Sequence, residues 1–301
     1  MSRLLLLTGL ALLLGGGAAR RLLAAGEVNP VRLRWLLLGW ALLFLGAGLS
    51  VYQPLRELGL LAPADVLDYL TGVGAGRAAL LLLLCATLFL LVEVWHWPAL
   101  MLVGLGGWAL WGLAGIGHGG IHGGTVRGLH ALHAGAMSIW VGGLAALLRW
   151  PAPSRRAAAQ RFSPIAAGCV ALLTLTGLGM GLNHVPTLDA LRQSEYGQTL
   201  LLKLLAFAGV LAAAGWVRRS LMRDWALLRT SEESARMYSA SPNPAFSSPR
   251  SARKNSLGIQ TIFRSRMTQE KLAALWPELL LLALVLLLTA RLGGLPLVHG
   301  V

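Results

Sequence analysis

The stretch Gly117–Leu148, GHGGIHGGTVRGLHALHAGAMSIWVGGLAALL, decides the fold of this chain. It begins as a glycine-rich loop and continues into an apolar segment that is long enough to cross a bilayer, for which a helix needs about 20 residues. It also holds four of the seven histidines in the chain. Because histidine is the commonest metal ligand, the stretch predicts a membrane helix with a binding site where the helix meets the loop.

The composition is that of a membrane protein. Of the 301 residues, 56% are hydrophobic and only 13% are charged, whereas soluble domains average about 25% charged residues. Apolar runs such as 35–52 and 279–290 offer almost nothing polar to water. The short alternating segments of a transmembrane barrel do not appear in the sequence. We therefore predict an all-α fold, a polytopic bundle of membrane helices.

Eight apolar segments are expected to span the membrane, in two parts of four helices each. Residues 1–125 would form the N-terminal part and residues 126–301 the second part. The first segment is interpreted as an uncleaved helix, because Arg20 and Arg21 follow its apolar run, whereas a signal peptide carries its charges before that run. The expected spans are approximately 4–20, 34–52, 77–95, 98–117, 126–148, 162–183, 199–221 and 272–292.

The basic residues give the expected orientation. Nineteen of the 26 Lys and Arg residues fall on one side of these spans and six on the other, with Lys203 inside a span. The positive-inside rule then makes the richer side cytoplasmic and both termini periplasmic. The same distribution explains the formal charge of +14 without a nucleic-acid partner. Six of the seven histidines fall on the outer side, and His96 lies on the cytoplasmic side.

Three connecting segments carry further predictions. Ala64–Leu70 is amphipathic and is expected to be a short surface helix. In the turn VEVWHWP, residues 92–98, Trp95 and Trp97 are interpreted as interfacial anchors, and Glu93 and His96 as a possible pair. The segment 230–266, rich in Ser, Pro and Arg, is expected to be a disordered cytoplasmic linker.

Histidine and methionine recur at one-turn spacing on two consecutive spans. His130, His133 and Met137 are spaced i, i+3, i+7, so they project from one helix face. Met180 and His184, spaced i, i+4, share a face of the next span. Because that span returns outward and short loops join neighbouring antiparallel helices, both sets are expected to meet near the outer surface.

This combination of side chains favours copper. Thioethers prefer Cu(I), and imidazole accepts either oxidation state of copper. Zinc prefers thiolate or carboxylate beside its imidazoles. His118 and His122, surrounded by glycine, are interpreted as a capture site on the outer loop. Cys85 and Cys169 lie in apolar segments without a disulfide framework, and each is either a small apolar residue or a way-station for Cu(I).

The same residues carry a family resemblance. LHALHAGAMSIWVGGLAALL resembles the His-bearing helix of the copper-resistance D (CopD) family of bacterial inner-membrane proteins. LTGLGMGLNH and SEYGQTLLLKLLAFAGVLAAAGWVRR resemble its next two helices, and ELLLLALVLLLTARLGGLP its closing helix. The resemblance covers approximately residues 126–223 and 270–297. It implies an eight-helix protein that handles copper across the inner membrane, often with a periplasmic copper-binding partner.

These observations together predict copper uptake or relay in copper homeostasis or resistance, without a covalent reaction catalysed. Two alternatives stay open at this point. One is a membrane redox protein with haem b, for which His130 and His184 would supply imidazoles from different helices. The other is an assembly factor that delivers copper to a respiratory oxidase.

Overall fold

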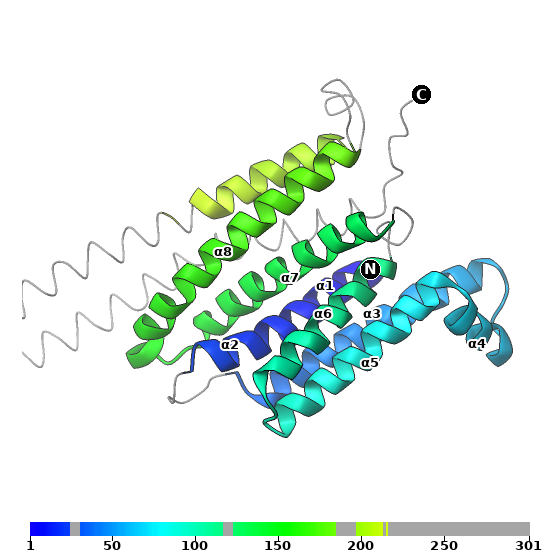
Figure 1. The fold of residues 1–301 in the computed structure, drawn as a ribbon, viewed down its shortest axis with the longest axis horizontal. Helices are drawn as coiled ribbons and strands as arrows, with labels where there is room; N and C mark the ends of the chain where they lie inside the picture. Colours follow the sequence, from blue (N-terminus) through cyan, green and yellow to red (C-terminus); the bar gives the residue numbers. More distant parts are fainter. Residues whose placement is uncertain (25–30, 117–122, 185–196, 213–214, 216–301) are drawn as a thin grey trace, which may run out of the picture. The chain divides into compact units, whose positions relative to one another are not determined.

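The computed structural model describes residues 1–24, 31–116, 123–184, 197–212 and 215 (Figure 1). Throughout these ranges the regular structure is helical and no strand occurs, which confirms the predicted all-α class. The elements are α1 (Ser2–Leu10), the π-helical turn η1 (Ala11–Gly15), α2 (Gly16–Leu22), α3 (Leu33–Glu57), α4 (Pro63–Gly72), α5 (Gly74–Val94), α6 (Ala99–Ile116), α7 (Gly123–Leu148) and α8 (Ala152–His184).

Six helices in the described part are long and apolar enough to cross a membrane, so the chain is a multi-pass membrane protein. They correspond to the first six of the eight expected spans. The seventh expected span, 199–221, overlaps a shorter apolar helix, Gly197–Ala212. The eighth, 272–292, lies outside the described residues. The six long helices are Ser2–Leu22, Leu33–Glu57, Gly74–Val94, Ala99–Ile116, Gly123–Leu148 and Ala157–Gly181.

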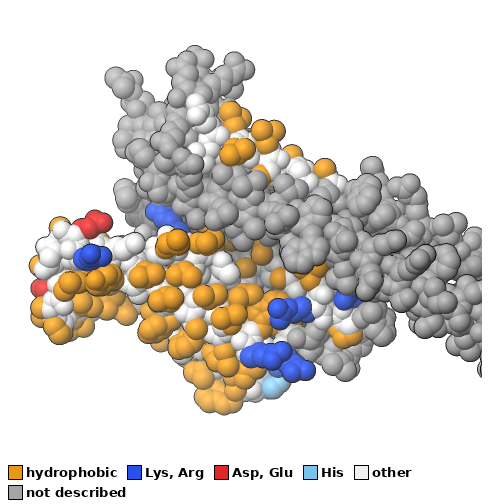
Figure 2. Space-filling view, turned by 180° about the vertical axis from the view of Figure 1, so that it is seen from behind, with side chains coloured by type: hydrophobic (Ala, Val, Ile, Leu, Met, Phe, Trp, Pro, Cys, Tyr) orange, Lys and Arg blue, Asp and Glu red, His pale blue; other side chains and the backbone are white. Residues whose placement is uncertain are grey.

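The outward faces of these helices are apolar, as lipid requires. Figure 2 shows hydrophobic side chains covering most of one face of the described bundle, with Lys and Arg gathered near its edge. An apolar surface this extensive would be unfavourable in water but is favourable in contact with the lipid chains of a bilayer. Large exposed side chains in this class include Leu38, Phe44, Leu84, Leu100, Val103 and Trp108.

The N-terminal helix lies at the centre of the packing. Residues 2–22 run continuously through α1, η1 and α2. In the 18-residue apolar stretch of this helix 61% is buried, the largest share among the six candidate spans. It packs against α3 and against α7. The π-helical turn η1 occupies its middle, at the level where it contacts α7.

Glycine permits these helices to approach at backbone distance. A Cβ atom at Gly15 would lie 2.8 Å from Cα of Gly142, and a Cβ at Gly142 would lie 2.6 Å from Cα of Gly15. The first helix and α3 meet in the same way at Gly9 and Gly39, where an added Cβ would come 2.7 Å from the facing backbone. Small residues at such crossings are a common means of packing membrane helices.

Arginines connect segments that the charge distribution assigned to one side. The Arg149 guanidinium lies 5.1 Å from the ring centroid of Trp35. Arg161 donates a hydrogen bond of 2.8 Å to the carbonyl of Leu23. The predicted cytoplasmic segments after the first and fifth spans therefore meet at one end of the bundle. The side of the membrane that this end faces stays a prediction.

The short helix expected at Ala64–Leu70 is present as α4. Pro63 begins it, where its missing N–H costs nothing. The Asp65 carboxylate accepts a hydrogen bond of 3.1 Å from the backbone N–H of Ala62 and so caps the helix start. None of its side chains is buried, in keeping with the expected surface position.

The contacts of the chain separate two units, and α1 to α8 all belong to the first. The second unit comprises 202–285, of which the structure describes 202–212 and Gly215. The functional division into residues 1–125 and 126–301 stays a prediction. The linker 230–266 lies outside the described residues.

Candidate metal centre

Helices α7 and α8 pack against each other as antiparallel neighbours (Figure 1). Their register is fixed by two contacts. Nδ1 of His133 lies 2.9 Å from Oγ1 of Thr176. One turn nearer the N-terminus of α7, the end that is predicted to be periplasmic and is called outward below, a Cβ at Gly179 would lie 3.6 Å from a methyl group of Leu129. The face of α7 that bears the predicted ligands is therefore directed towards α8.

The hydroxyl of Thr176 decides which nitrogen of His133 carries the proton. Its oxygen, Oγ1, lies 2.6 Å from the carbonyl oxygen of Leu172. The single hydrogen of the hydroxyl is donated to that carbonyl. It must therefore accept the hydrogen bond from His133, so Nδ1 carries the proton. When this imidazole is neutral, its lone pair is therefore on Nε2. Such a partner on the other ring nitrogen is what orients metal-binding histidines in proteins.

The helix opposite leaves room for this imidazole. Cε1 of His133 lies over Gly177, where an added Cβ would be at 3.7 Å. His130 lies one turn outward from His133, and its Nε2 atom is buried. Met180 lies one turn outward from Thr176 on α8. Because the helices are antiparallel, His130, His133 and Met180 fall within about 6 Å of one another along the helix axis, at 1.5 Å per residue.

The other predicted ligands lie at different levels. Met137 is one turn inward from His133 and is 6% exposed. His184 is the last residue of α8, two turns outward from Thr176. The backbone register therefore separates Met137 from His184 by about 18 Å along the axis. One ion, with ligands at about 2 Å, does not reach both of these residues.

Part of the predicted set lies beyond what the structure describes. His118 and His122 are outside the described residues, and of His184 only the backbone is described. Within the described ranges no three side chains from His, Cys, Asp and Glu come together in a way that could hold a metal ion. Among the predicted ligands, His130, His133 and Met180 lie at the closest levels along the two helices, and these two imidazoles and one thioether are called the candidate centre below.

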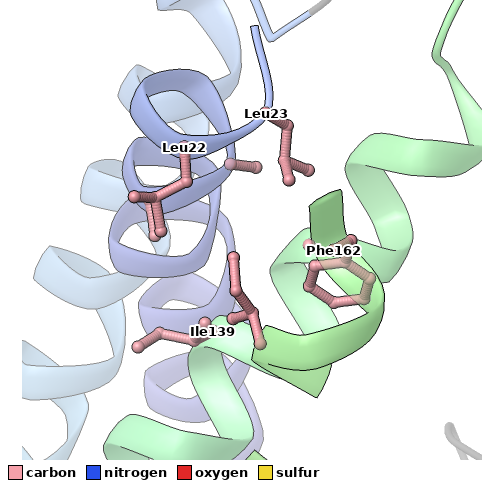
Figure 3. Close-up of a pocket in the computed structure, with 8 residues that line it drawn as sticks. Leu22, Leu23, Ile139 and Phe162 are labelled. Atoms are coloured by element: carbon pink, nitrogen blue, oxygen red, sulfur yellow. The ribbon is translucent and has the colours of Figure 1, made fainter. Parts of the chain in front are cut away.

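A pocket nearby lacks metal ligands. It lies between α2, α7 and α8, and Figure 3 shows Leu22, Leu23, Ile139 and Phe162 around it. Every residue that lines it is apolar, the others being Ala18, Ala19, Gly143 and Ile165. It offers no donor atom for a metal and is separate from the candidate centre.

Sequence reasoning missed two residues that shape the centre, Thr176 and Gly177. Thr176 precedes Met180 by four residues and therefore shares its helix face. The sequence signal that could have identified Thr176 is a hydroxyl on the helix face already assigned to metal ligands. Gly177 gave no signal, because its role depends on where the His133 ring lies.

Two comparisons with known proteins bear on this chain. Residues 156–242 match the family model described as copper resistance protein D, CopD, which confirms the resemblance over α8 and the residues that follow it. The chain is also similar to the copper transport protein CutJ of Bacillus subtilis (strain 168), with 32% identity over 138 residues. This alignment covers 39% of the chain and 26% of that relative, so the chain spans about a quarter of its length. No solved structure matches the chain.

Proposed function

Residues 156–242 of this membrane protein carry the CopD pattern, and from this premise we propose that the chain relays copper across the bacterial inner membrane. Copper is its cargo, and no covalent reaction is catalysed. The observation that carries the proposal is the hydrogen bond between His133 and Thr176, 2.9 Å long. It joins the histidine helix to the CopD-matched helix and holds one imidazole in the tautomer that binds metals through Nε2.

The donor atoms favour Cu(I) as the form carried. Two neutral imidazoles and a thioether make a soft, uncharged set, which suits a monovalent soft ion better than a hard divalent one. A neutral set also limits the charge that the protein places inside the bilayer, where ionised groups are costly. A periplasmic copper-binding protein is the proposed donor or acceptor at the outer end, with His118 and His122 assisting capture.

The register also supports an inward path. Met137 lies one turn inward from His133 on α7. Cys169 precedes Thr176 by seven residues, two turns along α8, and so shares its face. Both side chains are buried. Measured along the axis of α7, the positions of His133, Met137 and Cys169 are about 5 Å apart, in that order. We propose that they pass Cu(I) inward from the outer centre.

Replacing Thr176 with valine tests how the centre is built. The change keeps the volume but removes the acceptor that fixes the His133 tautomer, and losing such a partner typically costs 10–100-fold in metal affinity. We expect Cu(I) affinity to fall by about this factor in competition titrations with a Cu(I) chelator. Thr174→Val is the matched control, because the Thr174 hydroxyl is exposed and bonds only locally to Val170. Equal affinity in both variants would remove Thr176 from the centre.

Replacing Cys169 with alanine tests the path. The outer centre should keep its Cu(I) affinity, while copper flux into proteoliposomes should fall by about tenfold, as for a barrier raised by ~1.4 kcal/mol. Cys85→Ala serves as the control, because Cys85 is also buried but lies on α5. If both variants carry copper at the wild-type rate, the path does not pass through Cys169.

A further inference from the structure

Arginines at the other end of the bundle differ in the partners that they have. Nε of Arg21 lies 2.9 Å from Oε1 of the fully buried Glu93, at the end of α5, and Nε of Arg20 lies 3.3 Å from Oε2. The sequence suggested that Glu93 pairs with His96, but the structure pairs it with these arginines. Arg161 of α8 belongs to the same end and stands outside these ion pairs.

Arg161 keeps a positive charge that no described carboxylate neutralises. Its Nη1 donates to the backbone carbonyl of Leu23, at the end of the first helix, at 2.8 Å. In the ranges that the structure describes, no carboxylate lies at ion-pair distance from it, and Nε and Nη2 have no acceptor. These two nitrogens form one edge of the planar guanidinium, and such an edge matches two oxygens of a phosphate group.

The end of the first helix lies at the level of the lipid headgroups. Arg21, two residues before Leu23, donates to the carbonyl of Trp97 at 3.2 Å. Trp97 is 46% exposed and its neighbour Trp95 is 59% exposed, and exposed tryptophans of membrane proteins gather at the membrane–water interface. Since Arg161 bonds to Leu23, its guanidinium lies near the depth of lipid phosphates.

An apolar pocket begins beside this guanidinium (Figure 3). Leu23, whose carbonyl accepts the hydrogen bond, and Phe162, the residue after Arg161, both line it. Ile165 lines it too and is spaced i, i+4 from Arg161, so it lies on the same face of α8. Ile139 lines the part deeper in the bundle, about 13 Å before the end of α7. The pocket is shallow and partly open, and its lining is entirely apolar, which suits a hydrocarbon chain and disfavours a polar group.

We propose that a phospholipid binds here, with its phosphate on the Nε–Nη2 edge of Arg161 and one acyl chain in the apolar pocket. The two parts of the site match the two parts of this ligand, a cation at headgroup depth and an apolar surface below it. The hydrogen bond to Leu23 holds the guanidinium in place before the lipid arrives, so less entropy is lost on binding. A soluble phosphate would leave the pocket unused, and a lipid without phosphate would leave the guanidinium edge unpaired. The proposal does not depend on copper handling.

Native mass spectrometry of the purified full chain in detergent tests the phosphate part of the site. The protein would be titrated with phosphatidylglycerol and, separately, with a diacylglycerol of the same acyl chains. Arg161→Gln should weaken phosphatidylglycerol binding by about tenfold, the usual effect of losing charge-assisted hydrogen bonds, and leave diacylglycerol binding unchanged. Arg34→Gln is the matched control, because Arg34 is exposed at the start of α3 and does not line the pocket; it should bind both lipids as the wild type does.

Replacing Ala18 with leucine tests the acyl part. Ala18 lines the pocket, so the larger side chain should occupy it and weaken the binding of both lipids by about fourfold or more, the factor expected when one methylene group loses its apolar surroundings. Ala167→Leu is the control on α8, because Ala167 is exposed and lies outside the pocket lining. Equal lipid binding by these two variants would overturn the proposal, and so would displacement of phosphatidylglycerol by glycerol phosphate, which has no acyl chain.

A further variant protects the test against misfolding. Arg161→Lys keeps the charge and a donor for the Leu23 carbonyl but loses the planar edge. Its preference for phosphatidylglycerol over diacylglycerol should therefore fall between those of the wild type and Arg161→Gln. If Arg161→Gln does not fold, a reduced preference in Arg161→Lys supports the proposal and the wild-type preference overturns it. If Arg161→Gln folds, wild-type binding of phosphatidylglycerol by this variant overturns the proposal.

Discussion

Replacing both His130 and His133 with alanine is expected to weaken Cu(I) binding by more than about 100-fold, because changes in the partners of metal ligands alone already cost about 10–100-fold. The two imidazoles lie one turn apart on α7, and each is a larger contributor than a thioether. Competition titrations with a Cu(I) chelator on the purified protein measure the effect. Wild-type affinity in the double variant would assign this face of α7 to helix packing.

The two methionines sharpen this prediction. Met180 lies about 1.5 Å from the level of His130 along the helix axis, whereas Met137 lies about 10 Å from it, so Met180→Leu should lower Cu(I) affinity and Met137→Leu should leave it nearly unchanged. Leucine keeps the volume and apolarity of methionine, so both variants should fold. Combining each with His130→Ala should reveal energetic coupling for Met180 and additivity for Met137. The reverse pattern would move the centre one turn inward.

Replacing Gly142 with leucine is expected to have the largest effect on stability. The added side chain would meet the backbone of the first helix at Gly15, where a Cβ alone comes 2.6 Å from Cα. Overpacking typically costs about 1–3 kcal/mol and occasionally more, and here rigid backbone has to move. We expect a clear fall in the apparent unfolding temperature in detergent, with the helices retained by circular dichroism.

The matched control is Gly104→Leu. Gly104 is also a glycine within a candidate span, on α6, but a Cβ placed there meets nothing within 4 Å. This variant should keep the wild-type unfolding temperature. Equal destabilisation by both substitutions would contradict a special role for the crossing of the first helix and α7, because leucine favours a helix more than glycine does at either site.

The sequence predicted the helices well because hydropathy acts locally. Apolar runs of about 20 residues have few alternatives to a membrane helix, so the first six spans could be located before any contact was known. The spacing of His130 and His133 likewise predicted a shared face, since 3.6 residues per turn is a property of any α-helix.

The contacts between helices could not be predicted in the same way. The first helix packs in the centre because Gly9 and Gly15 face Gly39 and Gly142, and glycines elsewhere in the spans look the same in sequence. Which level of α8 meets His133 depends on that packing. Spacing alone therefore grouped Met137 with His184, whereas the register separates them.

The ion pair of Glu93 was missed for a related reason. Arg21 and Glu93 lie 72 residues apart in the chain. Arg21 was used only to predict the orientation in the membrane, and His96 was the partner nearer to Glu93 in sequence. Their encounter requires the end of α2 to lie beside the turn between α5 and α6. Long-range pairs of this kind follow from the tertiary arrangement and leave no local periodicity.

The most direct test of copper handling is metal analysis of the purified, Cu(I)-loaded full chain together with its visible spectrum. The proposal predicts stoichiometric copper and a colourless sample, because Cu(I) with imidazole and thioether ligands has a filled d shell. A Soret band with stoichiometric iron would instead identify a haem protein. A colourless sample without bound copper would also contradict the account.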